Sequence, residues 1–133
     1  MRKFASGATR SSDEGKIDYE GFLSPLALRR FGEYMQKHQV CEDGSLRASD
    51  NWQKGIPVDS YFKSLWRHFI DAWSAHRGWP HNESLEDALC AVVFNAQGAL
   101  HEVIKARLGT RIVRPAGQCT CAWCERRRMI EHR

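Results

Sequence analysis

The side chains best suited to chemistry lie in residues 49 to 68, SDNWQKGIPVDSYFKSLWRH, which combine cations, aromatic rings, an amide and a histidine. Asn51 can hydrogen-bond a base edge or a ribose, and Trp52 and Tyr61 offer faces on which a base can stack. His68 can serve as an acid, a base or a metal ligand. Three cations of the segment can pair with phosphate oxygens: Lys54, Lys63 and Arg67. The segment therefore predicts a nucleotide site, and the alternative is a basic surface loop that leads into an ordinary amphipathic helix.

Polar residues also recur at helical spacing on both sides of this candidate site. At 100° per residue, a polar stripe interrupted only by small residues runs along the expected third helix through Asp87, Ala91, Asn95, Gly98 and Glu102. A second stripe on the preceding helix holds Tyr61, Ser64, His68 and Asp71. If the two helices are antiparallel, the stripes can face each other and leave room for a ligand.

Carboxylates would converge with a histidine in that arrangement. Oxygen and imidazole donors suit Mg²⁺, Mn²⁺ or Co²⁺ bridging a triphosphate. The predicted metal ligands are His68, Asp71, Glu83, Glu86 and Asp87, and we expect Glu86 or Asp87 to be the catalytic general base. The alternative is a solvated face on which the last three carboxylates favour the positive end of a helix dipole.

Asn95 lies between Phe94 and Ala96 in an otherwise apolar part of the third helix. A buried amide costs stability unless it is hydrogen-bonded. Asn95 is therefore expected either to satisfy a backbone group or to contact a ligand.

Helical periodicity dominates the chain, and no convincing strand pattern is present, so we predict a small all-α bundle. Ser24 and Pro25 begin a first helix that ends near residue 39, and Pro57 precedes a second that ends at Gly78. Ser84, with a carboxylate three residues later, predicts a capping box for a third helix that ends at residue 109. Its expected buried face holds Leu85, Leu89, Val92, Ala96, Leu100, Val103 and Leu108.

These helices form the expected domain, residues 23 to 110, between an extended arm at residues 1 to 22 and a basic, Cys-rich tail at residues 111 to 133. With 133 residues the chain has room for one domain. A core of three helices is thin, so we expect a homo-oligomer. The longest apolar run is too short to span a membrane, and five cysteines, an odd number, favour thiols over a disulfide framework. A cytoplasmic location is therefore expected.

The tail has a chemistry of its own. Cysteines at CxCxxC spacing and one histidine predict a structural zinc site made by Cys119, Cys121, Cys124 and His132. The alternative is a basic terminus with reactive thiols. If zinc binds, the run of arginines from residue 126 to 128 could contact nucleic acid.

Three blocks of the sequence resemble the bacteriophage proteins grouped as the dATP/dGTP diphosphohydrolase N-terminal domain family. They are GATRSSDEGKIDYEGFLSPLALRRFGEYM, SDNWQKGIPVDSYFKSLWRHFIDAW and LEDALCAVVFNAQGALHE, and the resemblance covers roughly residues 5 to 108. It implies metal-dependent hydrolysis of dATP or dGTP to a monophosphate and pyrophosphate in phage nucleotide metabolism, within the host cytoplasm. The family blocks contain Arg10, Lys16, Asn51, Trp52, Lys54, Arg67, His68, Glu86, Asp87 and Asn95.

From their chemistry, Arg10, Lys16, Lys54 and Arg67 would hold the phosphates, and Asn51 and Trp52 the base. The chain is also similar in part to the all-α nucleoside triphosphate pyrophosphohydrolases, which use an ExxE pair on one helix and an ExxD pair on the next. Here His68-x-x-Asp71 and Glu83-x-x-Glu86 stand in those places. Because a histidine replaces one carboxylate, a non-catalytic phage protein that sequesters a signalling nucleotide remains a second hypothesis. The basic, Cys-rich tail keeps a third hypothesis open, a small zinc-containing nucleic-acid accessory protein.

Overall fold

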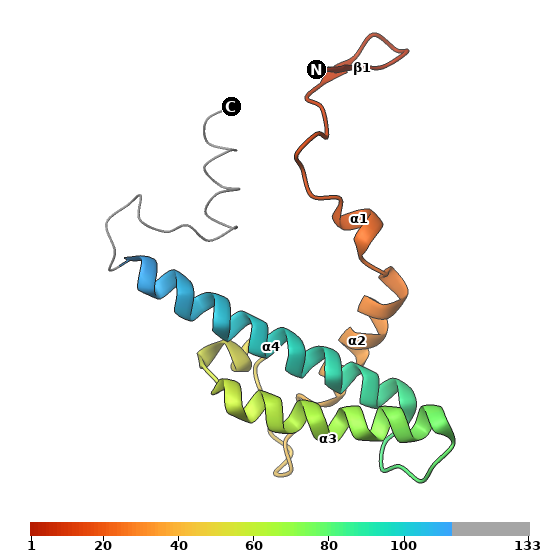
Figure 1. Cartoon of the computed structure of the whole chain (residues 1–133), viewed down its shortest axis with the longest axis vertical. Coiled ribbons are helices and arrows are strands. Elements are labelled where there is room, and N and C mark those ends of the chain that lie inside the picture. Colours follow the sequence, from red (N-terminus) through yellow and green to blue (C-terminus); the bar gives the residue numbers. More distant parts are fainter. Residues whose placement is uncertain (113–133) are drawn as a thin grey trace.

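The computed structural model describes residues 1–112 of the chain, with side chains to residue 109, and most of this part is helical. The four α-helices are α1 (Tyr19–Phe22), α2 (Pro25–Lys37), α3 (Val58–Arg77) and α4 (Leu85–Ile112), and η1 (Asn51–Lys54) is a 3₁₀ turn. The strands β1 (Arg2–Lys3) and β2 (Thr9–Arg10) form a two-residue antiparallel pair. α3 and α4 lie side by side as an antiparallel hairpin, and α2 crosses it at one end (Figure 1). The expected all-α bundle is thus confirmed in outline.

The helix boundaries follow the local signals in the sequence. The Ser24 hydroxyl accepts a hydrogen bond from the Ala27 amide, and Pro25 occupies the first helical turn of α2. α3 ends at Gly78, whose φ of 76° is the left-handed conformation that a glycine adopts at little cost. The Ser84 hydroxyl accepts from the Asp87 amide and so caps α4. α4 continues past Gly109 to Ile112, three residues beyond the expected end.

The N-terminal arm projects away from the helical hairpin (Figure 1). Every residue from 1 to 29 is exposed, which includes the first turn of α2. The arm was expected to be merely extended, and it contains in addition the β1–β2 hairpin and the single turn α1, capped by Asp18. An ion pair between Arg2 and Asp13 folds it back on itself.

The expected buried face of α4 is wrong for the single chain. Leu85, Leu89, Ala96, Leu100 and Val103 are exposed, whereas the buried positions are small or polar: Ala88, Cys90, Ala91, Asn95, Gly98 and Ala99. The physical reason lies in Tyr61, which is 2% exposed and packs directly against Gly98. A face of small residues lets α3 approach α4 closely, which a face of leucines does not allow.

Candidate nucleotide-binding pocket

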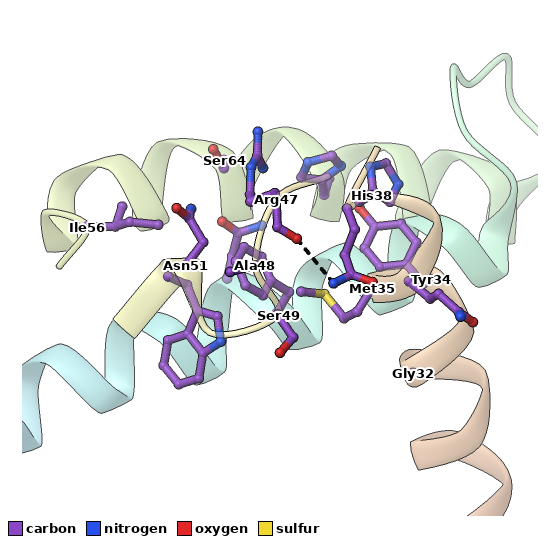
Figure 2. A pocket seen from close by; sticks show the side chains of 16 residues that line it. Gly32, Tyr34, Met35, His38, Arg47, Ala48, Ser49, Asn51, Ile56 and Ser64 are labelled. Carbon is purple, nitrogen blue, oxygen red and sulfur yellow. Dashed lines mark hydrogen bonds between the residues drawn. The ribbon is translucent and has the colours of Figure 1, made fainter. Parts of the chain in front are cut away.

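A cavity of about 540 Å³ opens between α2, the segment that follows it, α3 and α4. Figure 2 shows its wall, with Tyr34 and Met35 on α2, Asn51 on η1 and Ser64 on α3. The residues with polar or aromatic side chains that line it include Tyr34, His38, Arg47, Asn51, Trp52, Ser64, His68 and Asn95. Four of the residues that the sequence predicts for the site are therefore brought together: Asn51, Trp52, His68 and Asn95.

Asn51 and Trp52, the predicted base ligands, lie on η1, and Trp52 contacts α4. η1 carries Asn51 and Trp52 side by side, and the Trp52 ring contacts the His101 ring edge-on, with 4.7 Å between centroids. This contact braces the indole against α4 and leaves Trp52 at the wall of the cavity. A braced aromatic ring loses little conformational freedom when a base stacks on it.

The structure bears on both alternatives that the sequence left open for Asn95. The side chain is 6% exposed, and its Nδ2 donates a 2.8 Å hydrogen bond to the Ala91 carbonyl one turn earlier in α4. The amide thus satisfies a backbone group, as the first alternative requires. Asn95 also borders the cavity, so the same side chain remains within reach of a ligand.

His68 forms a hydrogen-bonded pair with Glu83. His68 Nδ1 lies 2.6 Å from Glu83 Oε2, and this bond joins the middle of α3 to the turn before α4. Each of the two side chains is 26% exposed. Because Glu83 engages Nδ1, the ring nitrogen left for the cavity is Nε2, which can accept or donate a proton there.

Glu86 and Asp87, the predicted catalytic carboxylates, lie in an ion-pair cluster with α2. Arg30 donates from Nε to Glu86 at 3.0 Å and from Nη2 to Asp87 at 2.6 Å, and Lys37 lies 3.6 Å from Asp87. The hydrogen bond from Arg30 is the main cause that lowers the pKa of Asp87. Both carboxylates therefore stabilise the contact between α2 and α4.

The predicted metal ligands divide into separate groups. Glu83 pairs with His68, Asp71 accepts from Asn82, and the remaining two carboxylates bind Arg30. Within residues 1 to 112, no three His, Cys, Asp or Glu side chains gather in a group that could hold a metal ion. Among the described residues, the predicted metal ligands are thus engaged in separate polar pairs.

Several predicted phosphate and base ligands do not line the cavity. Arg10 and Lys16 are on the arm, where Lys16 donates to Ser11, and Arg67 donates to Ser64 from outside the wall. Lys54 ends η1 without lining the pocket. Tyr61 is buried against Gly98 and has no free face for stacking. The four predicted zinc ligands, Cys119, Cys121, Cys124 and His132, lie outside the described residues.

Three residues at the wall were not singled out as ligands from the sequence. Tyr34 and His38 are one turn apart on α2, with ring centroids 4.3 Å apart. Burial, followed by the nearby Glu83 and Asp87 carboxylates, raises the pKa of Tyr34 to about 12, so its hydroxyl remains protonated at neutral pH. Arg47 is held beside the end of α2 because its amide donates to the Gln39 carbonyl at 2.7 Å. The sequence signal that could have indicated Arg47 is the Asp43-Gly44 turn. Val40 and Leu46 pair on either side of this turn, which brings the chain back to the end of α2.

Comparison with known proteins adds no family to this geometry. No protein-family model matches the chain, and neither the curated proteins nor the solved structures contain a similar one. The resemblance to the phage diphosphohydrolase family therefore remains a prediction. Among the helices of the described part, none is long and apolar enough to cross a membrane.

Proposed function

We propose that this chain binds a purine nucleotide in the cavity between α2, η1, α3 and α4. The observation that carries the proposal is the convergence of Asn51, Trp52, Arg47 and His68 on one cavity of about 540 Å³. That volume lies within the range of small-molecule sites, roughly 300 to 1,000 Å³. The residues supply in one place an aromatic face, an amide, a cation and an imidazole.

The base would bind at η1. Trp52 is braced by His101 and offers an indole for stacking, and the neighbouring Asn51 amide can donate to and accept from a base edge. A purine presents a larger stacking surface than a pyrimidine, which agrees with the base class implied by the family resemblance.

The phosphates would bind toward Arg47 and His68. Arg47 is the permanent cation at the wall, and the protonated hydroxyls of Tyr34 and Ser64 can donate to phosphate oxygens. One arginine neutralises little of the charge of a triphosphate. The nucleotide would therefore bind as its complex with Mg²⁺, Mn²⁺ or Co²⁺, and the ion would belong to the substrate.

Hydrolysis of dATP or dGTP is the second candidate, and the His68–Glu83 pair favours it. His68 Nε2 can take a proton from a water that attacks the α-phosphorus, while Glu83 stabilises the resulting imidazolium through Nδ1. The new bond joins the water oxygen to the α-phosphorus. The bond to the bridging oxygen breaks, and pyrophosphate leaves with the electron pair.

The experiment titrates the chain with each of the eight common nucleoside triphosphates in the presence of Mg²⁺, Mn²⁺ or Co²⁺, using calorimetry for binding and ion-exchange chromatography for products. We expect dATP or dGTP to bind, and Trp52→Ala to weaken binding about tenfold, because one stacked base contributes roughly 1 to 3 kcal/mol. Trp66→Ala is the matched control, since Trp66 is 61% exposed on α3 and does not line the cavity.

The outcomes separate the two candidates. Hydrolysis would be established if the parent chain forms monophosphate and pyrophosphate and if His68→Gln, assayed at saturating nucleotide, no longer forms them. If nucleotides bind in the presence of each ion but remain intact, only the binding function is supported. If no nucleotide binds, or if Trp52→Ala binds as tightly as the parent chain, the proposal is overturned.

A further inference from the structure

α4 carries an apolar face that no other described residue covers. Leu89, Val93, Leu100 and Val103 are each about half exposed, and Ala96 between them is also exposed. At 100° per residue these five positions fall within about 80° of arc. We call them the outer seam of α4. The seam lies away from the small-residue face that packs on α3.

The seam has the spacing of a helix-pairing surface. Its members follow one another at intervals of four, three, four and three residues, which keeps all five on one stripe of the helix. The exposed residues of α4 from 89 to 103 include no charged side chain. A stripe of this kind matches a second helix with the same spacing.

The seam continues into a groove of about 320 Å³ beside α2. Phe22, Leu23 and Leu28 line the groove together with Leu89 and Val93, and these three side chains are exposed by 79%, 50% and 52%. A stable protein interface buries roughly 800 Å² on each partner, so a partner helix would have to cover this groove as well as the seam. α3 carries a second exposed apolar face, in which Phe69 contacts Trp66 and Trp73 and Arg77 lies over the Trp73 ring.

We infer that the outer seam of α4 packs against the same seam of a second copy of this chain, with the two helices antiparallel about a two-fold axis near Ala96 and Gln97. This arrangement places Val93 of one copy opposite Leu100 of the other. The small Ala96 at the axis permits close approach of the two helices. An interface of this kind is isologous and therefore closes on a dimer.

The charges at the two ends of the seam favour the antiparallel direction. Glu86 precedes the axis by about as many residues as Arg107 follows it, and both are exposed. An antiparallel pair sets Glu86 of each copy against Arg107 of the other, whereas a parallel pair would set like charges together. The open groove beside Leu89 then receives the C-terminal half of the other copy's α4.

The test measures the mass of the full chain in solution by light scattering at about 50 µM. Val93→Lys and Leu100→Glu each place a charge in the seam, and each is expected to halve the mass of the assembly. Because both side chains are exposed in the single chain, helicity by circular dichroism should not change. Leu46→Lys is the control, as Leu46 is 76% exposed outside the seam.

Mixing the two variants tests the direction of packing. In the antiparallel dimer the lysine of one variant faces the glutamate of the other, and an equimolar mixture should regain the parent mass. The inference is overturned if the parent chain is a monomer, if the single variants keep the parent mass, or if the mixture stays at the reduced mass.

Discussion

The close contact between α3 and α4 predicts that Gly98→Ala destabilises the chain, although alanine is the better helix former. A Cβ atom at Gly98 would overlap the ring of Tyr61, which is fully buried. Overpacking of this kind costs about 1 to 3 kcal/mol. The intrinsic gain of alanine over glycine in a helix offsets about 1 kcal/mol of that cost. The expected net loss is therefore about 1 kcal/mol in the free energy of unfolding, within a range of about 0 to 2 kcal/mol.

Gly32→Ala is the matched control for this substitution. Gly32 is an exposed position within α2, and no atom lies within 4 Å of the Cβ that alanine would add. The same chemical change should therefore raise the free energy of unfolding by about 0.5 to 1 kcal/mol. The two variants are thus expected to change stability in opposite directions.

Urea unfolding followed by circular dichroism at 222 nm measures both variants against the parent chain. With an m-value of about 1 to 1.5 kcal/mol/M for a protein of this size, Gly98→Ala should lower the midpoint by about 1 M. A midpoint that rises for Gly98→Ala as it does for Gly32→Ala would refute the reasoning, because it would mean that α3 does not approach α4 through this glycine.

Two further predictions concern buried and paired groups. The Tyr61 hydroxyl is buried without a hydrogen-bond partner among the described residues. Tyr61→Phe should therefore leave the free energy of unfolding unchanged or raise it by up to about 1 kcal/mol. A loss above about 1 kcal/mol in urea unfolding would contradict this prediction. Arg30 lowers the pKa of Asp87 below its ordinary value near 3.9, so the pair stabilises the fold above that pH and this contribution is lost as the pH falls through the lowered pKa. Arg30→Gln should therefore reduce the slope of stability against pH below about pH 4, and equal slopes for the two chains would count against the pair.

The helix ends could be predicted because their signals are local. Ser24, Pro25, Gly78 and Ser84 each act within one turn of the backbone, and each occupies the position that its chemistry requires. Asn51 and Trp52 could be assigned to one site for the same reason, since they are adjacent in the sequence and both line the cavity.

Contacts between distant residues could not be predicted in this way. Arg30 binds a carboxylate that follows it by 57 residues, and nothing near either residue indicates the pairing. The sequence therefore offered Glu86 and Asp87 as free ligands, whereas the fold uses their charge to fix α2 on α4. Arg47 was missed for a different reason. The Asp43-Gly44 turn is visible in the sequence, but the turn alone does not show that Arg47 returns to the end of α2.

The two faces of α4 explain why apolar periodicity found the leucine face of this helix but wrongly predicted that the face is buried within the bundle. Periodicity shows that Leu89, Val93 and Leu100 need cover, but it does not say whether the same chain provides it. α3 instead takes the small-residue face, and this choice brings Asn95 to the cavity beside Gly98. Because α3 packs on the small-residue face of α4, Asn95 borders the cavity on that side and the outer seam stays exposed on the other. It follows that widening the α3–α4 contact at Gly98 should weaken nucleotide binding through Asn95, whereas a charge at Val93 should change the mass of the assembly without that effect.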